Sequence, residues 1–338
     1  MKIDTNEPCI LCGCEQSALL FEKRYPDFKH PGFFSIRKCE GCGLLFNSPR
    51  LSNHALAALY DKNYYFFQRS DADEFERIAA LYLRTIALIE NQITHKKAVE
   101  IGSAKGYLLA VLKYLEWQVL GIEISSSAAH MARSKFGVPT FTGTVEQYAT
   151  SPAKELFSVV LAIDVLEHVS SPVDFFNSID SILQDGILII DTPNGSAFNI
   201  QTLASEWKGF NPYHIQIFNK DNLTSLLRDR GYSIVNVFSY GNMIEYEQKS
   251  EQRGALMAAK SALTNLLAAT GVLDKTRQIY HKVKDSIVNR NSDIEKFYIE
   301  TVKTIEKNRS YFESDDARGE LFEEMRGDNI VIIARKGG

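Results

Sequence analysis

The sequence predicts an α/β protein built on a doubly wound, Rossmann-like sheet of seven strands. Three observations lead to this prediction. Strand-like and helix-like segments alternate from residue 98 to residue 240, all five cysteines lie in the first 42 residues, and the alternation stops over residues 241–328 before one last strand. We therefore expect four parts: a cysteine-rich module over 1–50, a helical linker or lid over 51–97, a core over 98–240 and 329–338, and a helical insertion over 241–328.

The composition is that of an ordinary globular protein. The chain has 338 residues, of which 45% are hydrophobic and 24% are charged. Its formal net charge of −4 provides no basic field that could hold a long nucleic acid. The first residues lack the apolar segment of a secretory signal, and no apolar run reaches the ~18 residues that a membrane helix needs. We therefore expect a cytoplasmic protein with no nucleic-acid partner and no membrane partner.

The cysteine pattern is typical of a metal site. Two pairs with the same spacing are separated by 26 residues: Cys9-x2-Cys12 and Cys39-x2-Cys42. In a reducing compartment, clustered thiols bind a metal more often than they form disulfides. Four sulfur ligands leave no position for water, so we expect a structural Zn2+ ion in a zinc-ribbon-like module. Cys14 lies outside the spacing and is not expected to be a ligand, and two unrelated cysteine pairs are the alternative.

The elements of the core follow from hydrophobic periodicity and from helix-end signals. Gly137 and Gly231 are expected to end two helices, and Ser171-Pro172 opens another as a cap followed by a first-turn proline. The predicted strands are 98–101, 119–122, 140–141, 157–163, 187–190, 233–238 and 329–334. The predicted helices are a short one from Ser52, then 71–93, 106–115, 127–136, one from Ser171, and 219–230.

Two features at the strand ends indicate a nucleotide-type ligand. The first core strand runs into Glu100-Ile-Gly102-Ser103-Ala104-Lys-Gly106 before a helix, and glycine there lets a ligand approach the backbone. Glu123 ends the next strand, 21 residues after Gly102, where a carboxylate accepts hydrogen bonds from ribose hydroxyls. The alternatives are a dinucleotide cofactor such as NAD, or a glycine turn and an exposed glutamate with no ligand.

Residues 98–240 resemble a class I S-adenosylmethionine-dependent methyltransferase. The segments that carry the resemblance are EIGSAKG (100–106), GIEIS (121–125), DVLEHV (164–169), DTPN (191–194), PYHIQIF (212–218) and FNKDNLTSLLRDRGY (218–232). The N-terminal CxxCG…CxxCGLLFNSPR segment resembles the zinc-binding domain that precedes such a core in sugar C-methyltransferases. The sequence departs from the family pattern at Ala104 in the glycine loop, and at Tyr213, where some relatives carry an acid.

The resemblance implies methyl transfer from S-adenosyl-L-methionine to a small acceptor, such as a sugar or a sugar nucleotide. It also implies that Asp164 lies beside the sulfonium and that Ile124 packs on the adenine, and it places a histidine base in the loop after the fifth strand. The expected cofactor-binding residues are Glu100, Gly102, Ser103, Ala104, Gly106, Glu123, Ile124, Val145, Glu146 and Asp164. The expected catalytic residues are His214, with His168 as the competing base and Glu167 beside it.

Several alternatives stay open at this point. Each expected catalytic residue also has a purely structural alternative. His214 could be a polar loop residue, His168 could be a turn residue, and Glu167 could cap the following loop. The whole chain could be an NAD-dependent sugar-modifying enzyme on a similar fold, which DVLEHV disfavours, or a non-catalytic zinc-ribbon adaptor, which the acidic balance disfavours. We expect the insertion to form a cap over the acceptor or a homodimer contact. The sequence does not distinguish C-, O- and N-methylation.

Overall fold

The computed structural model describes residues 7–24, 33–51, 56, 85–86, 88–241, 321–322 and 325–337. Most of three predicted segments lies outside these residues: the helix from Ser52, of which Leu56 is described, the helix over 71–93, and the insertion over 241–328. At the end of the 71–93 segment, the described residues include a short 3-10 helix, η3 (Glu90–Gln92).

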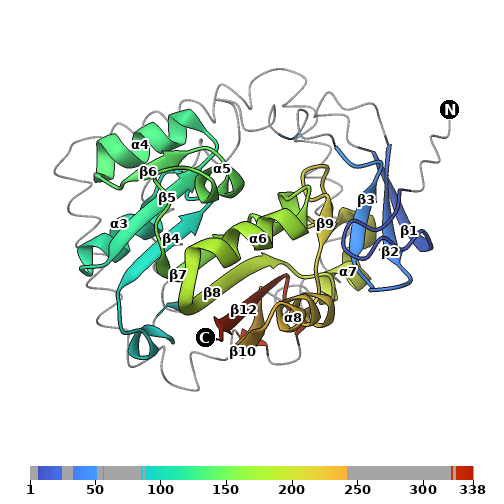
Figure 1. Cartoon of the computed structure of the whole chain (residues 1–338). Helices are drawn as coiled ribbons and strands as arrows, with labels where there is room; N and C mark the ends of the chain where they lie inside the picture. The colour runs from blue at the N-terminus through green and yellow to red at the C-terminus, as the bar shows by residue number, and fades with distance from the viewer. Residues whose placement is uncertain are drawn as a thin grey trace, which may run out of the picture.

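The centre of the molecule is a mostly parallel sheet, seen in Figure 1. Seven strands follow the order β10-β12-β8-β7-β4-β5-β6, and the two-residue strand β11 lies outside β10. The chain starts in the middle at β4, moves outward through β5 and β6, and then returns to β7 on the other side, so the doubly wound α/β fold is confirmed. The strands are β4 (Lys97–Ile101), β5 (Gln118–Glu123), β6 (Thr140–Thr142), β7 (Phe157–Ile163), β8 (Leu183–Pro193), β10 (Tyr232–Tyr240), β11 (Leu321–Phe322) and β12 (Asn329–Lys336).

The last strand, β12, runs antiparallel to both of its neighbours, β8 and β10. The chain leaves β10 at Tyr240 and enters β12 at Asn329, and these two residues are register partners. The excursion between them therefore starts and ends at the same edge of the sheet, and the returning strand must run in the opposite direction. The apolar pattern predicts this strand, whereas its direction follows from the pairing.

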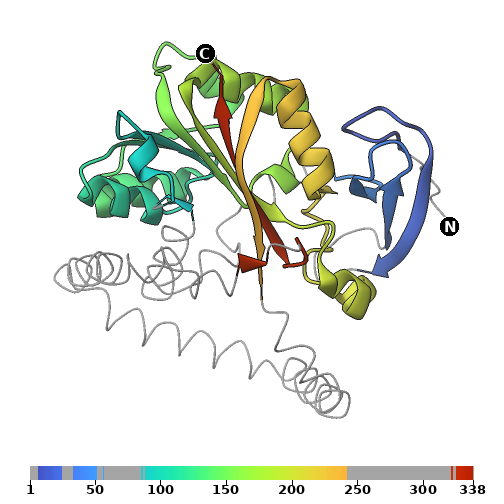
Figure 2. The ribbon, with the colours of Figure 1, turned by 90° about the horizontal axis from the view of Figure 1, so that it is seen from below.

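Helices cover both faces of the sheet (Figure 2). Alternate residues of β7 enter two separate cores: Val160 and Ala162 join the core that contains α6, and Val159 and Leu161 join the one that contains α3. Every helix in the described part of the chain is too short or too polar to traverse a lipid bilayer. The helices are α3 (Tyr107–Tyr114), α4 (Ser126–Phe136), α5 (Val145–Ala149), α6 (Pro172–Ile182), α7 (Phe198–Leu203), α8 (Lys220–Asp229), and the 3-10 helices η4 (Leu166–His168) and η5 (Ala204–Glu206).

The expected helix ends agree with the structure. Ser171 accepts a hydrogen bond from the backbone N–H of Asp174 as the N-cap of α6, whose first residue is the expected proline. Gly137 follows α4 with a φ of 60°, and Gly231 follows α8 with a φ of 83°. These left-handed conformations favour glycine, which explains why the helices stop there.

The N-terminal region forms a second, antiparallel sheet. Its strands β1 (Ser17–Arg24), β2 (Phe33–Cys39) and β3 (Leu45–Ser48) are joined by a fourth strand from the core, β9 (Gln216–Ile217). Figure 1 shows β9 reaching the blue N-terminal strands. β9 is not predictable from the sequence, because a strand of two residues has no measurable periodicity.

Candidate functional site

The four cysteines expected to bind zinc come together in the N-terminal region. The Sγ atom of Cys9 is 3.6 Å from that of Cys42, the Sγ atom of Cys12 is 3.5 Å from that of Cys39, and all four lie within 4.8 Å of one another. An ion held tetrahedrally at ~2.3 Å separates its sulfur ligands by about 3.8 Å, so this donor set fits zinc. The contact with Cys42 lowers the pKa of Cys9 to about 5. Cys14 lies outside the group, in agreement with its spacing.

Both cysteine pairs are followed by a tight backbone turn. The N–H of Gly13 donates to the carbonyl of Cys9 at 2.8 Å, and the N–H of Gly43 donates to that of Cys39 at 3.0 Å. Each glycine has a φ of 72°, a conformation that a residue with a Cβ rarely adopts. The glycine after each pair therefore lets the chain curl around the sulfur atoms.

The glycine-rich loop joins β4 to α3 at the carboxyl edge of the sheet. Gly102 and Gly106 have φ values of 70° and 76°. A Cβ on Gly102 would lie 2.5 Å from Val165 Cγ2, and one on Gly106 would lie 2.9 Å from Ala132 Cβ, so both positions require glycine. Ala104 also has a positive φ, 46°, which costs an L-residue roughly 1–2 kcal/mol. The departure from the family pattern thus leaves a strained residue in the loop.

Glu123 is tied into this loop from the end of β5. One carboxylate oxygen accepts a hydrogen bond from the N–H of Ala104 at 2.8 Å, and the other accepts one from the N–H of Ser125 at 2.7 Å. Burial raises the pKa of Glu123, and these two N–H donors act in the opposite direction. Since a carboxylate has about four acceptor positions, these hydrogen bonds leave Glu123 able to accept from a ligand as well.

The other residues expected at the cofactor differ in exposure. Ile124 is a large apolar side chain that is 48% exposed next to Glu123, as a residue that packs on a base must be. Ser103 is buried, and its Oγ has no hydrogen-bond partner among the described residues. Glu100 is buried at the end of β4, and Glu146 is half-buried in the first turn of α5. Val145 lies inside the core, so only its backbone is available to a ligand.

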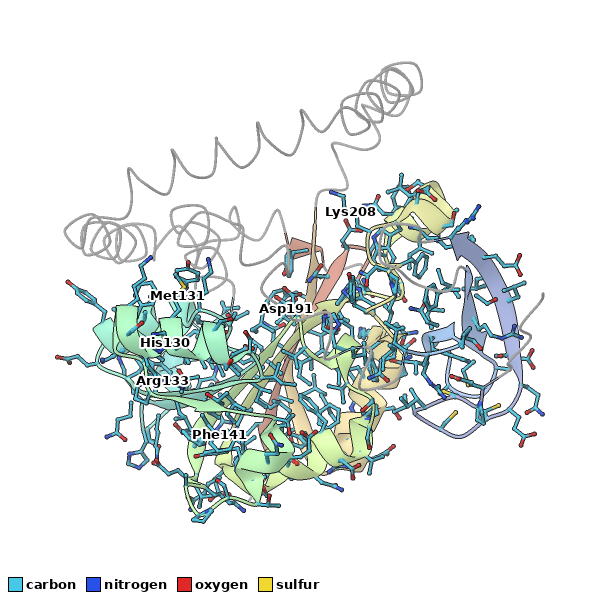
Figure 3. The ribbon with its side chains drawn as sticks, turned by 90° about the horizontal axis from the view of Figure 1, so that it is seen from above. His130, Met131, Arg133, Phe141, Asp191 and Lys208 are labelled. Atoms are coloured by element: carbon cyan, nitrogen blue, oxygen red, sulfur yellow. The ribbon has the colours of Figure 1, made fainter. Side chains whose placement is uncertain are left out.

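Asp164 follows β7 with a φ of 51°, next to the place where the strand order reverses. Its N–H donates to the carbonyl of Asp191 at 2.8 Å. The side-chain amide of Asn329 donates to carboxylate oxygens of Asp164 at 3.4 Å and Asp191 at 3.1 Å. The hydroxyl of Tyr240 donates to the other oxygen of Asp191 at 2.9 Å. Figure 3 shows Asp191 near the middle of the molecule, between α4 and the N-terminal sheet.

Three of these four residues were not among the expected site residues. Asp191 begins the DTPN segment, which is part of the family resemblance but was given no role in the site. Tyr240 is the last residue of β10, and Asn329 is the first residue of β12. Their convergence depends on β8, β10 and β12 being neighbours in the sheet.

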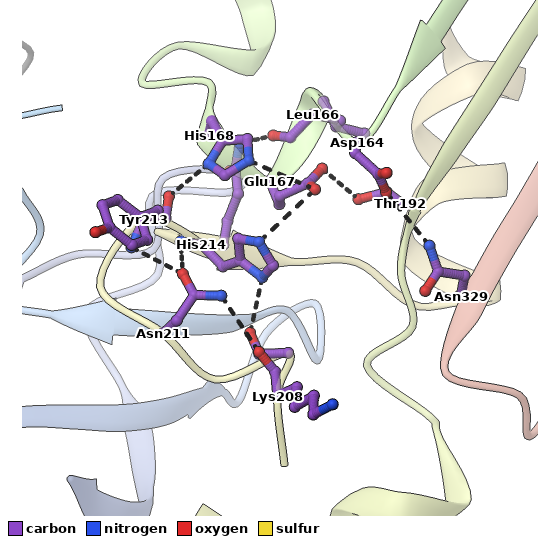
Figure 4. A network of polar contacts seen from close by, with 12 residues as sticks. Asp164, Leu166, Glu167, His168, Thr192, Lys208, Asn211, Tyr213, His214 and Asn329 are labelled. Atoms are coloured by element: carbon purple, nitrogen blue, oxygen red, sulfur yellow. Dashed lines mark hydrogen bonds and ion pairs between the residues drawn. The ribbon is translucent and has the colours of Figure 1, made fainter. Parts of the chain in front are cut away.

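The three expected catalytic residues meet at one point (Figure 4). Glu167 and His168 lie on η4, and His214 lies in the loop between η5 and β9. The Oε1 atom of Glu167 is 3.7 Å from His168 Nε2 and 3.9 Å from His214 Nε2. The two imidazole rings pack edge to face, with their centroids 4.9 Å apart. The hydroxyl of Thr192 donates to Glu167 Oε2 at 3.0 Å. We call Glu167, His168 and His214 the Glu-His-His cluster.

Hydrogen bonds to carbonyls define which imidazole nitrogen carries the proton. His168 Nδ1 is 2.9 Å from the carbonyl of Tyr213, and His214 Nδ1 is 2.8 Å from the carbonyl of Gly209. Since a carbonyl only accepts, both Nδ1 atoms carry the proton, and both Nε2 lone pairs face Glu167.

Burial favours the uncharged forms of all three side chains of the cluster. Burial lowers the pKa of His168 to about 4 and that of His214 to about 3, and it raises the pKa of Glu167 well above its ordinary value. A positive charge close to Glu167 would lower the pKa of this residue and favour its carboxylate form. A carboxylate oxygen and two imidazole nitrogens within 4.8 Å of one another are also a donor set able to hold a metal ion.

The loop that carries His214 is held by the N-terminal sheet. The buried side-chain amide of Asn47, on β3, donates to the carbonyls of Asn211 at 2.9 Å and His214 at 3.0 Å. Its backbone N–H donates to the carbonyl of Ile215 at 3.1 Å. Within the loop, Asn211 Oδ1 accepts the N–H groups of Tyr213 and His214, both at 3.0 Å.

The turn that carries Glu167 and His168 is held by β9. The side-chain amide of Gln216 donates to the carbonyls of Leu166 and Val169, each at 2.8 Å. Gln216 is fully buried. Asn47 and Gln216 were not among the expected site residues, although both lie in segments that carry the family resemblance. An amide that only holds backbone groups in place does not recur at a recognisable spacing in the sequence.

A model of the methyltransferase domain family matches residues 69–237, half of the chain. The chain belongs to this family. Its domain is of the class I, S-adenosylmethionine-dependent type, as the glycine loop, the acid after the second core strand and the sheet order lead one to expect.

The similar proteins are distant. Over 160 residues the chain is 26% identical to a probable S-adenosylmethionine-dependent methyltransferase of Mycobacterium tuberculosis, covering 47% of this chain and 55% of that protein. It is 27% identical over 104 residues to a mitochondrial ubiquinone biosynthesis O-methyltransferase of Arabidopsis thaliana, covering 29% and 32%. The chain thus spans about half or less of the length of these relatives. A solved S-adenosylmethionine-dependent methyltransferase from Archaeoglobus fulgidus has 16% identity and a TM-score of 0.47, covering 82% of this chain and 100% of that one.

Proposed function

We propose that this protein transfers a methyl group from S-adenosylmethionine to a small-molecule acceptor. One observation carries the proposal: the glycine loop with Glu123 and the Glu-His-His cluster share the carboxyl edge of the sheet where the strand order reverses. Ligands of doubly wound sheets bind at that edge. The loop and η4 are direct neighbours, because Gly102 abuts Val165, the residue before η4.

The cofactor is proposed to lie across the loop from β5 to β7. Glu123 accepts the ribose hydroxyls, Ile124 packs on the adenine, and Asp164 faces the sulfonium. Glu100 orients the amino end of the methionine. Gly102, Ser103, Ala104 and Gly106 line its path, with Glu146 and the backbone of Val145 near the edge of the adenine. The open acceptor positions of Glu123 and the exposure of Ile124 support this placement.

The reaction is a displacement at the sulfonium methyl. The acceptor atom forms a bond to the methyl carbon, the sulfur–carbon bond breaks with its electron pair left on sulfur, and the acceptor loses a proton. His214 is proposed to take that proton on Nε2, with Glu167 stabilising the imidazolium, and His168 is the competing base. The unprotonated Nε2 atoms that face Glu167 support this assignment.

A sugar or a sugar nucleotide is the acceptor that we propose, from the resemblance of the N-terminal segment to that of sugar C-methyltransferases. The competing functions are NAD-dependent sugar modification and a non-catalytic zinc-ribbon adaptor. A thermal-shift comparison of S-adenosylhomocysteine, NAD and an oligonucleotide separates the three. We expect S-adenosylhomocysteine, at about 100 times its Kd, to add about 2.7 kcal/mol of stability, and the others to add none. Stabilisation by NAD alone would contradict methyl transfer.

The acceptor is then sought directly. The protein is incubated with S-adenosylmethionine labelled in the methyl group and with nucleoside-diphosphate sugars, including keto sugars, and transfer of the label is measured. The isolated sugars serve as the comparison for the nucleotide. Label on a sugar carbon, oxygen or nitrogen identifies the type of methylation. A protein that binds S-adenosylhomocysteine and labels only acceptors without a sugar would contradict the acceptor class while leaving methyl transfer in place.

One structural zinc ion is proposed to be held by Cys9, Cys12, Cys39 and Cys42. Elemental analysis is expected to find one zinc ion per chain, lost in Cys39→Ser and retained in the control Cys14→Ser. Because the metal contributes to folding, Cys39→Ser is expected mainly to lower stability. Folded Cys39→Ser protein is expected to bind S-adenosylhomocysteine still. Loss of zinc in Cys14→Ser would overturn the ligand set.

The remaining parts of the chain are proposed to serve the acceptor. Residues 51–97 act as a helical linker or lid, and residues 241–328 act as a cap or as a homodimer contact. Deleting 250–320 is expected to change either acceptor affinity or the molar mass measured by light scattering. If both stayed as in the wild type, the insertion would be a solvated decoration.

A further inference from the structure

The N-terminal sheet and the core share a strand next to the Glu-His-His cluster. In the pairing of β3 with β9, Leu45 faces Ile217 and Phe46 faces Gln216. The other edge of β3 pairs with β2, where Leu45 faces Lys38, the residue before the zinc ligand Cys39. A single β2–β3–β9 ladder therefore runs from the cysteine cluster to a point two residues beyond His214.

Asn47 adds side-chain contacts to this ladder. Its carboxamide has two N–H donors, and both are used on the loop, by the carbonyls of Asn211 and His214. The side chain is only 3% exposed, so water cannot replace these partners without opening the interface. The carbonyl of His214 is thus held from β3, while its ring is held at Nδ1 by the carbonyl of Gly209. The backbone and the imidazole ring of His214 are therefore both held in place.

The opposite side of β9 holds the other half of the cluster. Gln216 donates to the carbonyls of Leu166 and Val169, which flank Glu167 and His168 in the chain. The two segments that form the cluster are therefore attached to one strand, and that strand is attached to β3. The His214 loop has no other regular structure between η5 and β9.

We propose that Asn47 is a positioning residue for methyl transfer, and that the zinc-binding module acts on the reaction through it. This inference rests on the proposed function of the Glu-His-His cluster. A general base must be held within about 0.5 Å of its productive position, and a misplacement of about 1 Å costs ~10²-fold in rate. Asn47 supplies that precision to a loop that the core alone leaves irregular, and zinc keeps β2 and β3 in place. The module is then a support for the loop that carries His214.

The test compares Asn47→Ala and Asn47→Asp with Tyr232→Phe. Asn47→Asp keeps the volume but has no N–H to donate, so it separates donor loss from a packing effect. Tyr232→Phe removes a hydrogen bond to Asp180 at the opposite edge of the sheet, and it serves as the control for lost stability.

Three measurements are made on the full-length, zinc-loaded protein. Calorimetry gives the affinity for S-adenosylhomocysteine. NMR of 15N-labelled histidine reports the tautomer and the titration of His214, whose ring faces Glu167 and His168. Turnover with an acceptor from the labelling assay gives kcat and KM.

Both Asn47 variants are expected to bind S-adenosylhomocysteine as the wild type does. Their His214 signals are expected to lose the single Nδ1-protonated form, and the pKa of His214 is expected to rise toward ~6.5 as water reaches the ring. The value of kcat is expected to fall ~10- to 100-fold, with a smaller change in KM. Tyr232→Phe is expected to change none of these quantities.

Other outcomes overturn the proposal. If the Asn47 variants keep the wild-type His214 signals and kcat, or if Tyr232→Phe shows the same losses, Asn47 has only a structural role. Should neither variant fold, the wild type is measured before and after chelation of zinc, and unchanged His214 signals in the metal-free, folded protein would contradict the coupling. A wild type that does not bind S-adenosylhomocysteine refutes the proposed function instead, and the NMR result then stands as a separate finding.

Discussion

The two halves of the candidate site are built in different ways. Apart from Asp164, the cofactor half comes from one continuous stretch, β4 to α5, in which Glu123 is held by the backbone N–H groups of Ala104 and Ser125. The acceptor half is assembled from separate segments, which contribute Asn47, Glu167, Thr192 and His214. The first half depends on local backbone geometry, whereas the second depends on contacts between residues far apart in the sequence. Changes far from the reaction should therefore reach the acceptor half more readily.

The largest expected effect tests the acceptor half. We expect His214→Ala to lower methyl transfer by ~10²–10⁴-fold, because the acceptor proton loses its base, and to leave the affinity for S-adenosylhomocysteine unchanged. His168→Ala is expected to lose less. The measurements are single-turnover transfer of labelled methyl and calorimetry. Equal activity of His214→Ala and the wild type would move the base to His168 or remove the need for one.

The second prediction concerns the pH dependence of folding. The pKa of His214 is about 3 in the folded protein and ~6.5 when unfolded, so between these values the unfolded state binds more protons. The contribution of His214 to the free energy of unfolding is therefore fully present above pH 6.5 and is lost as the pH decreases toward 3. Glu167, whose pKa is raised, has the opposite dependence and contributes less as the pH rises.

We expect His214→Gln to remove part of the acid sensitivity. Between pH 6.5 and 4.5, the wild type should lose about 2 kcal/mol more of its unfolding free energy than this variant does. Urea unfolding at several pH values measures the difference. His130→Gln is the control, because that residue lies exposed on α4 (Figure 3). A variant as acid-sensitive as the wild type would show that His214 is not buried uncharged.

A smaller effect is expected in the cofactor half. Glu123→Ala removes the proposed ribose contact, the hydrogen bond from the glycine-rich loop at Ala104 and the one from Ser125 at the start of α4. Losing a charged hydrogen bond costs about 1.5–3 kcal/mol, so S-adenosylhomocysteine should bind ~10- to 100-fold more weakly in calorimetry. The control is Glu155→Ala, which removes an exposed carboxylate paired with Lys97. Unchanged affinity in Glu123→Ala would refute the cofactor site.

The smallest effect is expected at Ala104. Replacing it by glycine relieves roughly 1–2 kcal/mol of left-handed strain, and the greater freedom of glycine in the unfolded chain offsets about 0.5–1 kcal/mol of this gain. Ala104→Gly should therefore raise Tm by about 1–2 °C in calorimetric scans. A lower Tm would mean that the methyl group of Ala104 makes contacts that outweigh the strain.

Of the seven strands expected in the main sheet, six were predictable because each has several apolar residues bounded by turn signals, and the short β6, with Phe141 alone, was predictable from its place between two helices. The Ser171 cap and the glycines after α4 and α8 were predictable because each requirement is local. The short elements α7 and β9 were missed, since a few residues provide no period to detect. The direction of β12 also needed the structure, because it depends on Tyr240 and Asn329 being partners.

The sequence by itself determined the elements and the chemical groups: two cysteine pairs with their glycines, a strand–glycine–helix turn with an acid one strand later, and a histidine in each of two loops. These signals are local, because they arise from backbone conformation and from spacing along the chain. Only the tertiary structure decided that Glu167, His168 and His214 meet, and that Asn47 and Gln216 hold them from β3 and β9. The physical reason is that a buried amide or imidazole needs hydrogen-bond partners. Here those partners are distant in sequence, and the order of the strands brings them together.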